Sequence, residues 1–286
     1  MDYQTLIDAP TWAFIRASEV ASPPDAAALT IADQRRIYDA MCRAFHQGYP
    51  PGVTAADGPV VGVPCRIFPG ALPNVLYLHG GGFVVGGLES HADICAEIRA
   101  RTGFAVVCAG YRLAPEHPHP AAYDDALAVA RALLAEGPLL LAGDSAGGNL
   151  AAAVCHALRA DPGLRGQVLI YPGLGGDRNA GSCPTHAHAP ILTRDDVLFY
   201  AGIAMAGRSR STTPAPRPCR TTIFPACRQP SPSGRNLTRS AMMPPPMPQG
   251  SALPGAGRWQ WWSPASSTAF CAPAPRFPAP PPVSPL

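Results

Sequence analysis

Apolar positions along the chain follow two patterns. Residues 1 to about 50 are predicted to be helical, because the apolar positions of Ile31–Phe45 recur at helical spacing until the run Tyr49-Pro50-Pro51-Gly52 ends the helix. Further along, short apolar runs typical of strands alternate with longer helical patterns. The strands are predicted at Val63–Phe68, Asn74–Leu78, Phe104–Ala109, Leu139–Ala142 and Gln167–Tyr171. The intervening helices are predicted at Glu89–Arg101, Ala121–Ala135 and Ala146–Arg159.

This alternation predicts an α/β fold with a mostly parallel sheet flanked by helices. The crossovers between parallel strands are right-handed and place helices on the faces of the sheet. Catalytic and ligand-binding groups in such sheets lie at the C-terminal ends of the strands. Two glycine-rich segments follow predicted strands, at residues 79–82 and 143–147, and they are therefore the candidates for chemistry.

The second glycine-rich segment fits the pattern G-x-S-x-G, with Ser145 between Gly143 and Gly147 and with Asp144 and Ala146 beside it. At a sharp turn from strand to helix, the serine hydroxyl is exposed and the N-terminus of the helix faces developing negative charge. Flanking glycines allow a strained backbone and close packing. In this setting Ser145 is the candidate nucleophile, and it needs a neighbouring base to accept its proton.

The first segment, His79-Gly80-Gly81-Gly82, ends an apolar strand and supplies backbone N–H groups without side chains in the way. Acyl transfer passes through an oxyanion that preorganised donors stabilise. We expect the N–H groups of Gly80, Gly81 and Ala146 to be these donors. The alternatives are a glycine-rich turn without a role, or a phosphate loop, which lacks the Lys-Ser/Thr pair that such loops carry.

The loop Tyr111–His117 follows another predicted strand. We interpret it as structural, with Arg112 and Glu116 bracing the loop beneath the site. Arg112 is expected to pair with Asp124 or Asp125.

Together these stretches resemble the hormone-sensitive-lipase-like group of α/β-hydrolases, also called fold-3 carboxylesterases, over about residues 40 to 203. The resemblance implies an α/β-hydrolase fold with an eight-stranded sheet, an N-terminal helical cap and hydrolysis of short-chain carboxylic esters through Ser, Asp and His. It makes Ser145 the nucleophile and implies a small-molecule ester substrate without any metal or cofactor. The oxyanion hole is Gly80, Gly81 and Ala146, and the supporting motif residues are His79, Gly82, Gly143, Asp144 and Gly147.

Composition divides the chain near residue 205. The first 196 residues carry all nineteen acidic residues and thirteen arginines, whereas residues 197–286 carry nine arginines, no acid and nineteen of the thirty-six prolines. Such a composition is typical of segments without a packed core. We therefore expect a helical cap at 1–50, a hydrolase core at 51–205 and a disordered tail at 206–286. We interpret this tail as the product of a gene translated out of its reading frame.

The acid and the base of the resembling family are missing from the tail. In that family they lie in an Asp-Pro-Leu segment and in a His-Gly-Phe segment, after the seventh and eighth strands. After Asp196 this chain has no Asp, Glu or His. His186 and His188 lie in an earlier loop, where the family offers no precedent for a base.

Both missing segments reappear when synonymous codons for Thr221–Phe270 are read two bases later. The lost acid would straddle Leu237–Thr238 and the lost histidine Ser267–Thr268. We therefore predict a shift of reading frame within about Ile203–Ser211, through a sequencing error or a genuine lesion. The last two strands and a helix of the fold would then be absent, and the chain as written would be inactive or severely impaired.

Other functional classes fit the sequence less well. The arginines of the tail are scattered singly rather than clustered, so nucleic-acid binding is not expected. A polyproline docking segment is disfavoured because no regular P-x-x-P array is present. The open alternative is a non-catalytic hydrolase-fold protein that binds a ligand. The oligomeric state cannot be inferred.

The cysteines and the N-terminus suggest where the protein acts. The nine cysteines form no C-x-x-C pair and no zinc-like spacing, which favours buried free thiols in a reducing compartment. No signal peptide is evident, and no apolar run reaches the roughly 18 residues of a membrane span. We expect a cytoplasmic protein.

Overall fold

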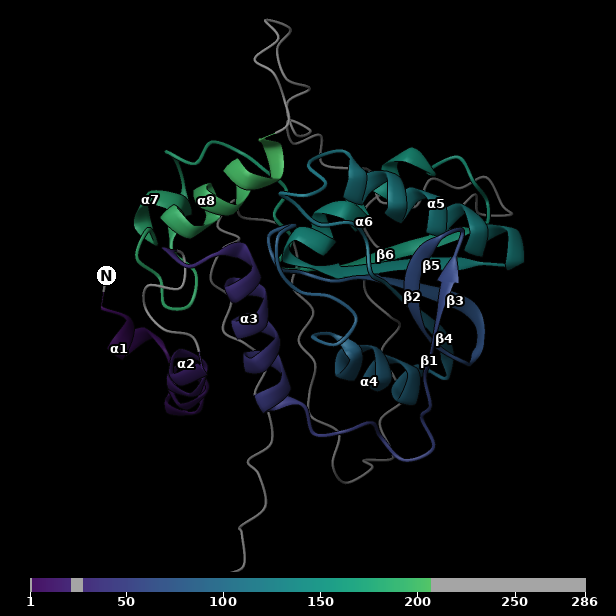
Figure 1. The fold of residues 1–286 in the computed structure, drawn as a ribbon, viewed down its shortest axis with the longest axis horizontal. Helices are drawn as coiled ribbons and strands as arrows, with labels where there is room; N and C mark the ends of the chain where they lie inside the picture. The colour runs from purple at the N-terminus through teal and green to yellow at the C-terminus, as the bar shows by residue number, and fades with distance from the viewer. Residues whose placement is uncertain (1, 22–27, 207–286) are drawn as a thin grey trace, which may run out of the picture.

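The computed structural model describes residues 2–21 and 28–206, which form a twisted sheet with helices on both faces (Figure 1). The sheet has six strands in the order β1-β2-β4-β3-β5-β6. Their bounds are β1 Ala56–Val60, β2 Val63–Phe68, β3 Ala71–Leu78, β4 Phe104–Ala109, β5 Leu139–Asp144 and β6 Leu164–Ile170. All five predicted strands are confirmed, with ends that differ by a few residues.

Strands β4, β3, β5 and β6 run parallel to one another. At one edge, β2 pairs antiparallel with β4, and β1 pairs antiparallel with β2. The sheet is therefore mostly parallel, as predicted. Strand β1 was not predicted, because its sequence Ala-Asp-Gly-Pro-Val lacks an apolar run. Its proline is tolerated because an edge strand has N–H groups that need no partner strand.

Alternate residues of β3 build the two layers of the core. Leu76 and Leu78 pack against the helices on one face, and Val75 and Tyr77 pack toward the other face, where α4 lies. The helices that cover the two faces of the sheet are α4 Ala92–Thr102, α5 Ala121–Glu136 and α6 Ser145–Ala157. All three were predicted. Helix α4 starts later than expected, because Ser90 and His91 belong to the loop before it.

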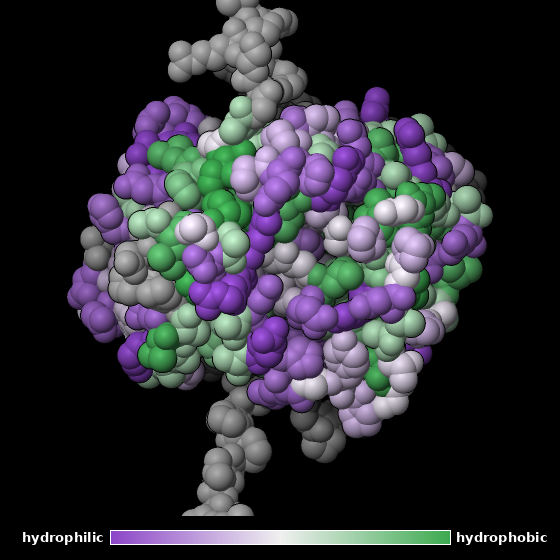
Figure 2. Space-filling model, in the orientation of Figure 1, coloured by the Kyte–Doolittle hydropathy of each residue, from purple (hydrophilic) through white to green (hydrophobic). Residues whose placement is uncertain are grey.

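The remaining helices lie beyond the C-terminal ends of the strands (Figure 1). They are α1 Tyr3–Leu6, α2 Ala9–Ala21, α3 Ile31–Phe45, α7 Ser182–Thr185 and α8 Arg194–Met205. The helical character predicted for the first 50 residues is confirmed, including both ends of α3. Apolar surface gathers over α7 and α8 (Figure 2). Exposed apolar residues of this segment are Ile191, Leu192, Leu198, Phe199 and Met205.

The predicted tail from residue 207 onward lies outside the described residues, so the domain boundaries and the missing strands stay predictions. None of the helices within 2–21 and 28–206 has the length and apolar character that crossing a bilayer requires.

Candidate active site at the carboxyl ends of β3 and β5

Ser145 lies at a sharp turn where β5 passes directly into α6. Its φ of +51° is a left-handed backbone conformation that costs a non-glycine residue about 1–3 kcal/mol. The side chain is half-buried at the N-terminus of α6, where the first N–H groups of the helix have no intrahelical acceptor. The structure therefore gives Ser145 the strained strand-to-helix position that its motif predicted.

The two flanking glycines are required by close packing. A Cβ atom on Gly147 would lie 1.9 Å from the carbonyl oxygen of Leu78, at the end of β3. A Cβ on Gly143 would lie 2.5 Å from the carbonyl oxygen of Gly147. Helix α6 thus starts directly against the neighbouring strand, which fixes the position of Ser145.

The glycine segment after β3 lies beside this turn, since Leu78 pairs with Gly143 in the parallel register of β3 and β5. The Gly80 N–H donates to Oδ1 of Asp144 at 2.9 Å. This bond competes with the predicted role of Gly80 as an oxyanion donor, which stays a prediction. Its N–H is already used, because Asp144 directly precedes the turn and its carboxylate reaches back to β3.

The next N–H groups of the segment are those of Gly81 and Gly82. Within the described part of the chain, no protein acceptor binds either of them or the N–H of Ala146. Gly82 was expected only to support the motif, yet it is available as a donor where Gly80 is not. The N–H groups of Gly81, Gly82 and Ala146 are therefore the candidate oxyanion donors in this arrangement, with Gly82 in the place expected for Gly80.

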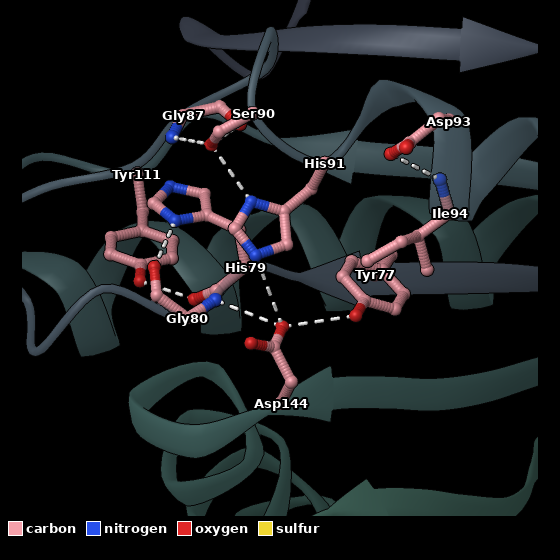
Figure 3. Close-up of polar contacts among 10 residues, drawn as sticks. All are labelled: Tyr77, His79, Gly80, Gly87, Ser90, His91, Asp93, Ile94, Tyr111 and Asp144. Atoms are coloured by element: carbon pink, nitrogen blue, oxygen red, sulfur yellow. Dashed lines mark hydrogen bonds and ion pairs between the residues drawn. The ribbon is translucent and has the colours of Figure 1, made fainter. Parts of the chain in front are cut away.

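Asp144 is the polar centre of the site (Figure 3). Its Oδ1 accepts hydrogen bonds from the Tyr77 hydroxyl at 2.9 Å and from Gly80, and it lies 3.4 Å from Nε2 of His91. Burial raises the pKa of the Asp144 carboxyl, but the hydrogen bond and charge of His91 and the bond from Tyr77 outweigh it and leave the pKa below its ordinary value. An ionised Asp144 therefore joins both glycine segments.

His91 is only 3% exposed and bridges Asp144 to Ser90, whose Oγ lies 2.8 Å from His91 Nδ1. Ser90 in turn accepts from the N–H of Gly87. The sequence signal was a Ser-His pair just before a predicted helix core, but its partner lies 53 positions away.

His79 is fully buried and stacks on Tyr111, with ring centroids 4.2 Å apart and ring planes 9° from parallel. The Tyr111 hydroxyl donates to the carbonyl oxygen of His79 at 2.6 Å. Burial, with a smaller contribution from the neighbouring His91, lowers the pKa of His79 to about 3. The neutral ring can then donate its Nδ1–H to the Gly80 carbonyl, 2.7 Å away, which orients the glycine segment.

This buried histidine predicts a pH dependence of stability. The pKa of His79 falls from 6.5 to about 3 on folding, so the unfolded chain binds more protons between these values. The free energy of unfolding is therefore unaffected by this group above pH 6.5. It decreases as the pH falls toward 3, by up to about 1.4 kcal/mol per pH unit. Urea unfolding at pH 7, 6 and 5 measures the slope. In His79→Phe, which keeps a ring on Tyr111, the slope should be reduced, and an unchanged slope would contradict the assignment.

The loop Tyr111–His117 braces the site as expected. Arg112 binds Asp125 rather than Asp124, through its backbone N–H and its guanidinium at 2.8–3.1 Å. Glu116 pairs with Arg35 of α3, a partner that the sequence did not suggest.

His186 and His188 do not lie among the residues around Asp144 in the described part of the chain. The Nδ1 atom of His186 lies 3.1 Å from the hydroxyl of Tyr3, in α1. Asp195 and Asp196 occupy the first turn of α8, and Asp196 forms a capping box with Thr193.

No group of three His, Cys, Asp or Glu side chains suited to a metal ion occurs in residues 2–21 and 28–206. A polar cavity of about 120 Å³ lies between α3 and the loop before α4, and Ser145 does not line it. Its lining residues are Asp39, Arg43, His46 and Glu89. Buried cysteines in the described part of the core are Cys65, Cys95, Cys108 and Cys155, whereas Cys42 and Cys183 are half-buried.

Comparison with known proteins finds esterases. A family model described as an alpha/beta hydrolase fold matches residues 75–229. The chain is 39% identical over 169 residues to Esterase LipI of Mycobacterium tuberculosis, covering 52% of this chain and 53% of LipI. It is 42% identical over 134 residues to Carboxylesterase NlhH of the same species, covering 43% of this chain and 42% of NlhH. The chain thus spans about half the length of the curated relatives it matches.

Solved structures agree with these sequences. An esterase from the bacterial hormone-sensitive lipase family superposes with a TM-score of 0.62 at 32% identity, covering 68% of each chain. EstE1, a thermostable carboxylesterase cloned from a metagenomic library, superposes with a TM-score of 0.56 at 31% identity, covering 63% of this chain and 68% of EstE1.

Proposed function

Because the chain belongs to the α/β-hydrolase family, in its hormone-sensitive-lipase-like group, we propose that it carries the nucleophile and oxyanion donors of a serine carboxylic-ester hydrolase. The observation that carries the proposal is Ser145, held at φ +51° at the start of α6 beside the glycine segment of β3. A left-handed backbone at Ser145, next to a glycine of α6 that packs too closely on the end of β3 for a side chain, favours a nucleophile over a structural serine.

In the proposed reaction, Ser145 Oγ attacks the carbonyl carbon of a small ester while a base accepts its proton. The carbonyl oxygen becomes an oxyanion, which accepts hydrogen bonds from Gly81, Gly82 and Ala146. The carbon–oxygen bond to the alcohol breaks, the base returns the proton to the leaving alcohol, and an acyl group remains on Ser145. Water then attacks the acyl group with the same base, which releases the carboxylic acid and restores the hydroxyl.

The base and its acid partner are the parts that this chain does not supply in the family's order, since no Asp, Glu or His follows Asp196. We propose that they are encoded one frame away, after a frame shift within about Ile203–Ser211. Residues 207–211 of that segment lie outside the described residues. Ser145 then lacks its proton acceptor, and turnover by the chain as written is severely reduced.

Turnover of p-nitrophenyl acetate and butyrate tests the proposal, with Ser145→Ala as the control. We expect the chain as written to hydrolyse both esters slowly and Ser145→Ala to change the rate little, because the hydroxyl has no base. Fast turnover that Ser145→Ala abolishes would contradict the proposed lesion. Resequencing the gene around codons 203–211 separates a reading error from a genuine lesion, and a reread that repeats the present frame excludes the error.

The missing base also favours a second candidate, a hydrolase-fold protein that binds an ester-sized ligand without hydrolysing it. Saturable binding of butyrate esters by a stably folded chain, with no turnover once the frame is restored, would favour this candidate over the enzyme. The dispersed cysteines of the sequence, which form no C-x-x-C pair, support our further proposal that the protein acts in the reducing cytoplasm.

A further inference from the structure

Arg35 of α3 reaches out of the N-terminal helices and contacts both loops behind the site. Its Nε donates to the carbonyl oxygen of Val84 at 2.8 Å, and its Nη2 donates to that of Ala114 at 2.8 Å. The other edge of the guanidinium meets the carboxylate of Glu116, at 3.0 and 2.7 Å. A planar group with five fixed donors can satisfy three acceptors in this way, whereas a lysine cannot.

The two carbonyls belong to the junction of the glycine segment with the loop that follows β4. The N–H groups of Val84 and Val85 both donate to the carbonyl oxygen of Gly81, at 3.0 and 2.9 Å, which closes the turn after the glycines. The N–H of Ala114 donates to the carbonyl oxygen of Phe83 at 2.9 Å. Arg35 therefore binds the same turn that carries the N–H groups of Gly81 and Gly82.

Packing around this junction is dense. Val84 is fully buried and Ala114 is 2% exposed, in an apolar cluster that Ile31 and Tyr38 of α3 join. Charge-assisted hydrogen bonds to carbonyls in such surroundings are stronger than neutral ones. Arg35 itself is only 28% exposed, so its two carbonyl contacts are shielded from water.

We propose that Arg35 is a positioning residue for ester hydrolysis, which holds the turn at residues 81–85 so that the N–H groups of Gly81 and Gly82 face the oxyanion. This rests on the proposed function, because it assigns those N–H groups a catalytic task. Misplacing oxyanion donors by a fraction of an ångström slows the chemical step without weakening binding of the ester.

Hydrogen exchange measured by mass spectrometry on the full chain tests the proposal, with Arg35→Met as the variant and Arg36→Met as the matched control. Arg36 is the next residue of the same helix, is 73% exposed and contacts only Asp33 among the ion pairs of the described residues. We expect exchange of the peptide covering residues 80–86 to rise about tenfold in Arg35→Met, with the rest of the sheet unchanged. Arg36→Met should leave that peptide as it is in the wild type.

The same preparations are assayed with p-nitrophenyl butyrate. Even without a base, the residual rate of such a site comes from its oxyanion donors and binding, so it still reports on them. We expect Arg35→Met to lower kcat by about 10–100-fold with KM unchanged. The kcat of Arg35→Lys should lie between those of the wild type and Arg35→Met. Glu116→Gln should lower kcat less than about threefold, because it keeps both carbonyl contacts of Arg35.

The outcomes are separable. Exchange that rises equally in both methionine variants, or a kcat that Arg35→Met leaves unchanged, would overturn the positioning role. Local exchange together with a fall in kcat supports it. If the chain with its reading frame restored shows no ester turnover while exchange still rises only at residues 80–86, the proposed function fails and with it the catalytic task of Arg35, although the contact itself stands.

Discussion

Gly147→Ala is expected to lower the free energy of unfolding by more than about 4 kcal/mol and to prevent folding at moderate temperature. The added Cβ would lie 1.9 Å from the carbonyl oxygen of Leu78 and 2.4 Å from that of His79, both of them backbone atoms. Neither atom can rotate away, because β3 is hydrogen-bonded to strands on both sides. Relief would require α6 to move off the sheet, which would carry Ser145 with it. Urea unfolding of the variant measures the loss.

Gly202→Ala is the matched control, since Gly202 is also a glycine within a helix. It is exposed on α8, and a Cβ there would meet nothing within 4 Å. Alanine favours the helix over glycine, so this variant should gain about 0.5–1 kcal/mol. A Gly147→Ala protein within about 1 kcal/mol of the wild type would contradict the close approach of α6 to β3.

Restoring the reading frame after Ile203 is expected to raise kcat for p-nitrophenyl butyrate by at least about 10³-fold over the chain as written. Loss of a triad base in a serine hydrolase costs on the order of 10⁶ in kcat, and a remainder survives from oxyanion donors and binding. Under the proposed function the chain already carries the nucleophile and the donors, so that only the base and the acid are missing. KM should change less than kcat, because the base acts on the transition state.

Ser145→Ala in the restored chain is the control for this prediction. It should return kcat to the level of the chain as written, because a base without a nucleophile is as ineffective as a nucleophile without a base. A restored chain that hydrolyses neither acetate nor butyrate would contradict the proposed esterase.

Elements with strong local signals were predictable from the sequence. The buried run Phe104–Ala109 and the amphipathic helix Ile31–Phe45 were predicted to the residue, because periodicity and helix-ending residues are local properties. Strand β1 was missed because its Asp-Gly-Pro sequence gives no strand pattern and it is held only by pairing with β2. Helix α8 was missed as well.

The site divides in the same way. Ser145 and its two glycines follow from a motif whose residues are adjacent in sequence. The roles of His91 and Arg35 do not, since their partners Asp144 and Glu116 are 53 and 81 positions away. The hydrogen bond from the Gly80 N–H to Asp144 was equally hidden, because it depends on where the carboxylate of Asp144 points after folding.

Covalent trapping on the restored chain tests the central claim most directly. A p-nitrophenyl alkylphosphonate should release p-nitrophenol once and leave its phosphonyl group on the peptide that contains Ser145, as read by mass spectrometry. We predict one adduct per chain, at Ser145, and none in Ser145→Ala. Ester hydrolysis that continues with Ser145 unmodified, or that survives Ser145→Ala, would contradict the assignment of Ser145 as the nucleophile.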